Sequence, residues 1–141
     1  MNGGDLNVYK FGAIRGARGI VIRKGQTINI VNPSVNKQSI YNGFSSALPE
    51  NTYGIGVTGN PLDVVENLNI SNGYIEACTR HLVIDKGTCV NLENNLIADN
   101  GVSGNVGASL QDGNSLIQIG NDVKSLNAKL NTIWATSNGT V

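Results

Sequence analysis

Residues 67–75 read Asn-Leu-Asn-Ile-Ser-Asn-Gly-Tyr-Ile, two short segments of alternating polar and apolar residues around Asn72-Gly73. Alternation with a period of two is typical of a half-buried β-strand. An Asn-Gly pair supplies the positive φ angles of a tight turn at low energetic cost. The stretch therefore predicts a strand, a turn and a second strand.

The same pattern of short strands and turn residues extends over residues 20–113. Residues 20–22 and 27–31 are strand-like and flank Arg23-Lys24-Gly25-Gln26, which predicts a hairpin. Strand-like segments then recur at a spacing of about 8–12 residues, which is typical of a β-sandwich or barrel. We therefore expect a mainly β fold, a small β-barrel or sandwich, over residues 20–113.

A short parallel β-helix is the alternative fold. Residues 67–75 resemble residues 91–101, 24 positions later, and both stretches place Asn at the expected turns. The spacing suits one coil of such a helix. Only two coils can be matched, however, and stacked-repeat folds need about three or more. The parallel β-helix therefore ranks second.

Residues 1–19 are expected to form a flexible N-terminal attachment arm. They contain Gly12, Gly16 and Gly19, and no hydrophobic period runs through them. Glycine loses much conformational entropy when it is ordered, so a partner would be needed to order this arm. Basic and aromatic side chains in the arm and just after it predict docking on an acidic protein surface; they are Lys10, Phe11, Arg15, Arg18, Arg23 and Lys24.

The apolar residues of the C-terminal part recur at alternating intervals of three and four. This spacing is the seam of a coiled coil, and the residue types favour three or four helices over two. We therefore expect a coiled-coil helix over residues 114–136, a tail over 137–141 and a homotrimer. An amphipathic helix lying on its own β-domain is the alternative. The expected oligomerisation residues are Leu116, Ile119, Val123, Leu126, Leu130 and Ile133.

Composition argues against several function classes. Ten basic side chains balance ten acidic ones, and charged residues make up 14% of the chain, below the usual quarter or so. The net charge is +5 over residues 1–49, −7 over 50–122 and +2 over 123–141. The overall neutrality argues against a general nucleic-acid or membrane binder. Opposite patches on one small protein suit ordered assembly.

The sequence offers few groups for catalysis or metal binding. Cys78, His81 and Cys89 could ligate zinc, but their spacing matches no common zinc finger and a fourth ligand is missing. His81 is the only histidine, and no nucleophile elbow accompanies it. Paired carboxylates such as Asp63 with Glu66, or Glu93 with Asp99, are more simply solvated turn residues. We therefore expect no enzyme activity, no catalytic or metal site and no cofactor.

Several short motifs resemble the β-barrel domain of tailed-phage head decoration and head-fibre proteins. The resemblance covers about two-thirds of the chain, and its motifs, which include a turn, a hairpin and a closing strand, are short and rich in glycine. The motifs are Arg23-Lys24-Gly25-Gln26-Thr27, Tyr53-Gly54-Ile55-Gly56-Val57, Asn72-Gly73-Tyr74-Ile75-Glu76-Ala77, Asp85-Lys86-Gly87-Thr88-Cys89-Val90, Ala98-Asp99-Asn100-Gly101 and Val106-Gly107-Ala108-Ser109-Leu110-Gln111-Asp112-Gly113. The sequence departs from that family in its Asn-rich turns and its long segment at 32–51.

The resemblance implies a virion structural protein made in the host cytoplasm and located on the capsid exterior. It would be a decoration protein or head-fibre base that oligomerises through its C-terminal helix. The arm would then bind the major capsid protein or another virion protein, with no nucleic acid or membrane involved. The N-terminus lacks the pattern of a signal peptide. The alternative function is a tail-fibre or spike fragment that binds a host-surface receptor or glycan.

Overall fold

The computed structural model describes residues 4–16, 18–38, 53–60, 62–76, 78, 80–99 and 117–135. Within them the chain forms fourteen strands and no helix, so none that could cross a membrane. The strands are β1 (Leu6–Tyr9), β2 (Gly12–Gly16), β3 (Arg18–Ile22), β4 (Gly25–Val31), β5 (Ser34–Gln38), β6 (Tyr53–Val57), β7 (Val65–Ser71), β8 (Tyr74–Glu76), β9 (Leu82–Gly87), β10 (Cys89–Glu93), β11 (Leu96–Asp99), β12 (Ile117–Val123), β13 (Leu126–Lys129) and β14 (Thr132–Ala135).

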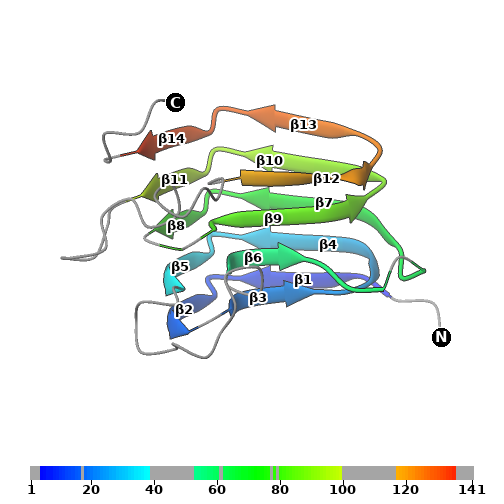
Figure 1. The fold of residues 1–141 in the computed structure, drawn as a ribbon, viewed down its shortest axis with the longest axis horizontal. Coiled ribbons are helices and arrows are strands. Elements are labelled where there is room, and N and C mark those ends of the chain that lie inside the picture. The colour runs from blue at the N-terminus through cyan, green and yellow to red at the C-terminus, as the bar shows by residue number, and fades with distance from the viewer. Residues whose placement is uncertain are drawn as a thin grey trace.

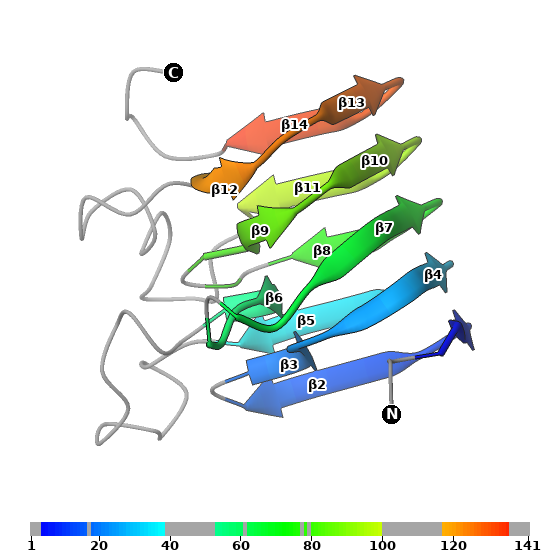
Figure 2. The same ribbon diagram turned by 90° about the vertical axis from the view of Figure 1, so that its right-hand side faces the viewer.

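The strands build three parallel sheets that surround one core. Sheet A has the order β1-β4-β7-β10-β13, sheet B has the order β14-β11-β8-β5-β2, and sheet C has the order β12-β9-β6-β3. Consecutive strands belong to different sheets, so the chain visits each sheet in turn and stacks coil on coil (Figures 1 and 2). This architecture is a parallel β-helix.

Successive coils differ in length but keep a common register. Equivalent residues of sheet A lie 22, 40, 22 and 36 positions apart along the chain. The two longer coils contain the connections from β5 to β6 and from β11 to β12. Both connections run from sheet B to sheet C, so most of the extra residues enter between these two sheets, and the connection from β6 to β7 adds a few more.

Aliphatic side chains stack in rows inside the coils. Ile28 pairs with Leu68 in sheet A, Val35 with Ile75 in sheet B, and Ile55 with Leu82 in sheet C. Burial of each such side chain stabilises the fold by about 1.5–3 kcal/mol. The largest fully buried side chains of these rows are Ile28, Ile30, Val35, Ile55, Leu68, Ile70, Ile75, Leu82, Ile84 and Ile97.

A two-residue corner joins each strand of sheet A to the next strand of sheet B. Its first residue has a positive φ of 53–55° in every coil, and asparagine, which tolerates this conformation better than most residues, occupies three of the five positions. Four of the corners are followed by another coil. In each of them the backbone N–H of this residue donates to a carbonyl of that coil. Pairing therefore continues around the corner. The five residues are Lys10, Asn32, Asn72, Asn94 and Leu130.

The expected β-barrel or sandwich is wrong. Residues 20–22 lie in β3 of sheet C and residues 27–31 in β4 of sheet A, so they do not form a hairpin. The lower-ranked alternative, stacked coils, describes the architecture. The expected spacing of 24 residues between these two coils is wrong. Asn69 lies opposite Asn91, so the observed spacing is 22 residues.

The expected flexible N-terminal arm is also wrong. Strands β1, β2 and β3 form the first coil and pair with β4, β5 and β6. Ala13 and Ile20 pack against the core. Gly19 is required here because a Cβ would come 2.5 Å from the carbonyl oxygen of Gly54. The glycine at position 19 therefore serves close packing between coils.

The expected C-terminal coiled-coil helix is wrong wherever the chain is described. Residues 117–135 form β12, β13 and β14, which pair with β9, β10 and β11. The segment contains one glycine, three asparagines and three β-branched isoleucines, which lowers its helix propensity. The heptad-like spacing has another origin. Leu126 and Ile133 lie in β13 and β14, and the two-residue corner between these strands places them seven positions apart. Leu116, residues 114–115 and the tail 137–141 lie outside the described residues.

Candidate functional site

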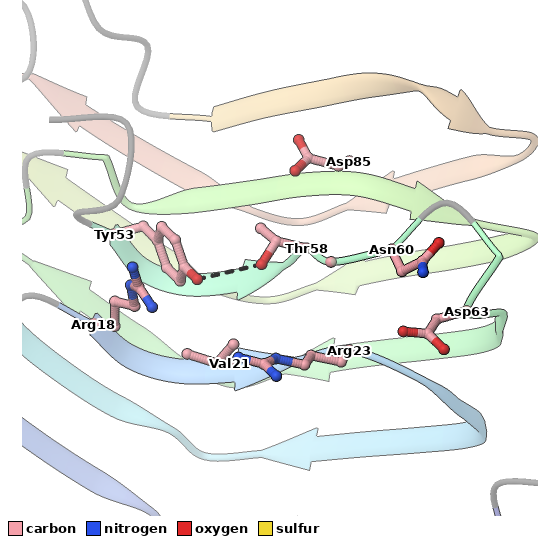
Figure 3. Close-up of a pocket in the computed structure, with 9 residues that line it drawn as sticks. Arg18, Val21, Arg23, Tyr53, Thr58, Asn60, Asp63 and Asp85 are labelled. Carbon is pink, nitrogen blue, oxygen red and sulfur yellow. Dashed lines mark hydrogen bonds between the residues drawn. The ribbon is translucent and has the colours of Figure 1, made fainter. Parts of the chain in front are cut away.

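The outer face of sheet C carries a pocket of about 480 Å³. Strand β3 forms one wall, β6 forms the floor and β9 lies on the far side (Figure 3). The connection from β6 to β7 closes one end of the pocket. The lining residues are Arg18, Val21, Arg23, Tyr53, Thr58, Gly59, Asn60, Asp63 and Asp85.

Tyr53 fixes the floor of the pocket. Its ring lies over Gly56, where any Cβ would overlap the ring, and its hydroxyl lies 3.3 Å from Thr58 Oγ1. The guanidinium carbons of Arg18 and Arg80 lie 5.8 and 5.9 Å from the ring centroid. This distance allows a cation–π interaction with each. Tyr53 is only 3% exposed, so it orients Arg18 rather than offering a free aromatic platform.

The connection from β6 to β7 is held by hydrogen bonds through Asn60. The Asn60 carbonyl accepts from Lys86 Nζ at 2.8 Å and from the Asp63 N–H at 2.9 Å. Its Oδ1 accepts from the Leu62 N–H at 3.0 Å. These bonds place Asp63 at the end of the pocket.

Three charged side chains of the pocket have no partner among the described residues. The side chains of Arg23, Asp63 and Asp85 make no hydrogen bond or ion pair within the described part of the chain. Arg23 and Asp63 lie toward the same end of the pocket, and Asp85 lies across β6 from them (Figure 3). The pocket can therefore offer donors and acceptors to a polar ligand without first breaking internal bonds.

The predicted docking residues do not form one cluster. Arg18 and Arg23 line the pocket, and Lys24 is exposed beside it, between β3 and β4. Lys10 and Phe11 are exposed at the corner between sheets A and B. Arg15 belongs to β2 in sheet B. The structure therefore brings together two of the six.

The predicted oligomerisation residues do not form one stripe either. Ile119 and Val123 belong to β12, Leu126 to β13 and Ile133 to β14. Leu130 occupies a corner with φ 53°, and Leu116 lies outside the described residues. They are therefore distributed over three strands and a corner.

His81 and the cysteines occupy separate environments. Cys78 and His81 are buried, whereas Cys89 is partly exposed at the start of β10. Within the described residues, no three His, Cys, Asp or Glu side chains gather as metal ligands would. Burial lowers the pKa of His81 from 6.5 to about 4, against opposing effects of the Ala98 carbonyl and Glu76. His81 is therefore a neutral core residue at pH 7.

Several pocket residues were missed by sequence reasoning. Tyr53, Thr58 and Asn60 come from residues 53–60 and Asp85 comes from β9, and only the pairing of β6 with β9 brings these two segments together. One sequence feature pointed to this face in part. Gly54 and Gly56 alternate with apolar residues along β6, but only Gly56 lies under the Tyr53 ring, whereas a Cβ at Gly54 would meet Ile75 and Cys78 of the core.

Comparisons with known proteins add no family to these observations. The chain matches no protein-family model, no curated protein and no solved structure.

Proposed function

We propose that this chain is a binding module of a fibre or spike, and that the sheet C pocket binds a hydroxyl-rich glycan of a host surface. The observation that carries the proposal is the set of charged side chains without internal partners, Arg23, Asp63 and Asp85, around one pocket. The parallel β-helix supports it as a rigid scaffold, because Asp85 lies on β9, Arg23 directly follows β3, and hydrogen bonds through Asn60 hold the connection that carries Asp63.

The chemistry of the pocket suits a glycan without net charge. Asp63 and Asp85 can each accept hydrogen bonds from neighbouring hydroxyl groups, and Arg23 can donate a fork of hydrogen bonds to hydroxyl oxygens. Two arginines and two aspartates balance in charge. Val21, 41% exposed, adds an apolar contact for the C–H face of a sugar ring. Such a mixture of a few polar groups with an apolar contact is typical of small-molecule sites.

Capsid decoration is the weaker proposal. It relied on a loose basic arm for docking and a helix for trimer formation, and strands replace both in the described residues. The basic residues that it assigned to docking are also divided between a corner of sheets A and B and the sheet C pocket.

Loss of a pocket charge should weaken glycan binding by about tenfold or more, since a hydrogen bond to a charged group contributes about 1.5–3 kcal/mol. The wild-type chain is first screened on an array of neutral and acidic glycans. The affinity for the best ligand is then measured by calorimetry for Arg23→Ala and Asp63→Ala. Lys24→Ala is the matched control, because Lys24 is exposed next to Arg23 but does not line the pocket.

Two results would contradict the proposed function. One is a wild-type chain that binds no glycan on the array. The other is an affinity that Arg23→Ala and Asp63→Ala leave equal to that of Lys24→Ala.

A further inference from the structure

A ladder of five asparagine side chains runs along the outer face of sheet A. In each step, Nδ2 of the later coil donates to Oδ1 of the preceding coil. The first three steps measure 2.7 Å and the last measures 3.3 Å. The ladder therefore has a direction from coil to coil. Its members are Asn7, Asn29, Asn69, Asn91 and Asn127.

The two ends of the ladder are complementary. Asn7 accepts from Asn29, but its own Nδ2 donates to no described residue. Asn127 donates to Asn91, but its Oδ1 accepts from no described residue. One end thus has a free donor and the other a free acceptor.

The backbone edges and the core are open at the same ends. β1 and β2 begin sheets A and B, and β13 and β14 end them, so each has one unpaired edge in the described chain. Apolar side chains of the core rows are exposed there: Leu6 at 50%, Leu126 at 45% and Ile133 at 56%. Unpaired edges with exposed apolar residues are templates for pairing with another chain.

We infer that copies of this chain associate head to tail, with β1 and β2 of one copy stacking on β13 and β14 of the next. Asn7 of the first copy would donate to Oδ1 of Asn127 in the next copy and so extend the ladder across the interface. Ladders of this kind stabilise stacked parallel strands. The occupant is a second copy because only the same coil geometry continues this register.

The two edges match residue by residue. β1 and β13 both have four residues, and the corners that follow have the same φ of 53° at Lys10 and Leu130. Continued register places Leu6 on Leu126, Asn7 on Asn127, Val8 on Ala128 and Tyr9 on Lys129. Neither this row nor Ala13 on Ile133 in sheet B opposes two like charges, which would be destabilising.

The interface is confined to two sheets and does not close. In the described part of the chain, sheet C ends one coil earlier, at β12, so sheets A and B carry the contact. The two surfaces differ, and a heterologous contact that does not close on itself produces open chains of copies. The average mass in solution should therefore rise continuously with concentration.

The polarity of the ladder supplies the first test. Asn7→Asp keeps an acceptor for Asn29 within the chain but removes the donor for Asn127 of the next copy. Sedimentation velocity of the full chain, over about a hundredfold range of concentration, should show association weakened by about tenfold or more. The melting temperature of dilute protein should stay unchanged. An association constant equal to that of the wild type would overturn the inference.

Blocking each end separately supplies the second test. Leu6→Lys and Leu126→Lys change exposed residues at opposite ends, and each variant alone should remain monomeric. An equal mixture should form dimers and nothing larger, because one open end of each variant remains. Leu62→Lys is the control, since Leu62 is 87% exposed and away from both ends, and it should associate like the wild type.

The inference fails if the wild type is monomeric at every concentration, if either blocked variant still associates, or if their mixture stays monomeric. It is independent of the sheet C pocket, so glycan binding by a strictly monomeric chain would overturn the stacking alone.

Discussion

The unfolding free energy should fall by about 3 kcal/mol between about pH 7 and pH 4 through the single histidine alone. Burial lowers the pKa of His81 from 6.5 to about 4 in the folded protein. Between these two values the unfolded chain binds a proton that the native state does not. The contribution of His81 is therefore fully present above about pH 6.5 and is lost as the pH falls to about 4.

The surroundings of His81 explain why it stays neutral. Its side chain is fully buried, and Nε2 lies 2.9 Å from the Ala98 carbonyl, to which it donates in the neutral ring. Nδ1, where a second proton would bind, has no partner among the described residues. A buried charge without an acceptor is strongly unfavourable. The carbonyl of Ala98 and the charge of Glu76 reduce this penalty only in part.

Urea unfolding at several pH values, compared between the wild type and His81→Gln, measures this effect. The glutamine amide can still donate to the Ala98 carbonyl but does not titrate. Carboxylates contribute to both proteins alike, so the difference between the two curves isolates His81. Because the chain has one histidine, NMR can also follow its ring directly. Parallel stability curves, or a ring that titrates near pH 6.5, would contradict the prediction.

Local features of the fold could be predicted from the sequence. The alternation in residues 67–75 does form β7 and β8, and Asn72 does adopt a positive φ, of 55°. These features depend on neighbouring residues only. Alternation and turn residues do not specify which strand pairs with which, and that choice separates a barrel from a β-helix.

The register could not be predicted because the coils have unequal lengths. Asn29 and Asn69 are adjacent in the ladder, yet 40 residues separate them, so no constant repeat is visible in the sequence. The corners add a second difficulty. Leu126 and Ile133 lie seven apart on either side of the corner at Leu130, which imitates a heptad although both residues are in strands.

The candidate site was predictable only in part. Arg18 and Arg23 were singled out for their charge, and both line the pocket. Arg18 was expected in a loose arm and Arg23 at a hairpin turn, whereas Arg18 lies in β3 of sheet C and Arg23 directly follows that strand. Asp85 joins them from β9, more than 60 positions along the chain from Arg23. Only the pairing of β3, β6 and β9 brings these side chains to one face.

Asn95 occupies the inner side of a corner between sheets A and B, where its side chain links its own coil to the preceding and the following coil. Its side chain is 1% exposed. Oδ1 accepts from the Gly73 N–H at 2.8 Å, and Nδ2 donates to the Ile70 carbonyl at 3.0 Å and to Asn131 Oδ1 at 2.9 Å. Both amide hydrogens and the amide oxygen are therefore engaged. No apolar side chain of similar size can replace Asn95.

Asn95→Leu should therefore lower the unfolding free energy by about 2–4 kcal/mol, since each buried polar group that loses its partner costs about 1–3 kcal/mol. Urea unfolding of dilute protein, followed by circular dichroism, measures the loss as a lower midpoint at unchanged slope. Asn67→Leu is the matched control, because Asn67 lies on β7 of the neighbouring coil and is exposed, and its cost should stay within about 0.5 kcal/mol. Equal midpoints for the two variants would mean that apolar packing alone holds the corner, and that the asparagine there is dispensable.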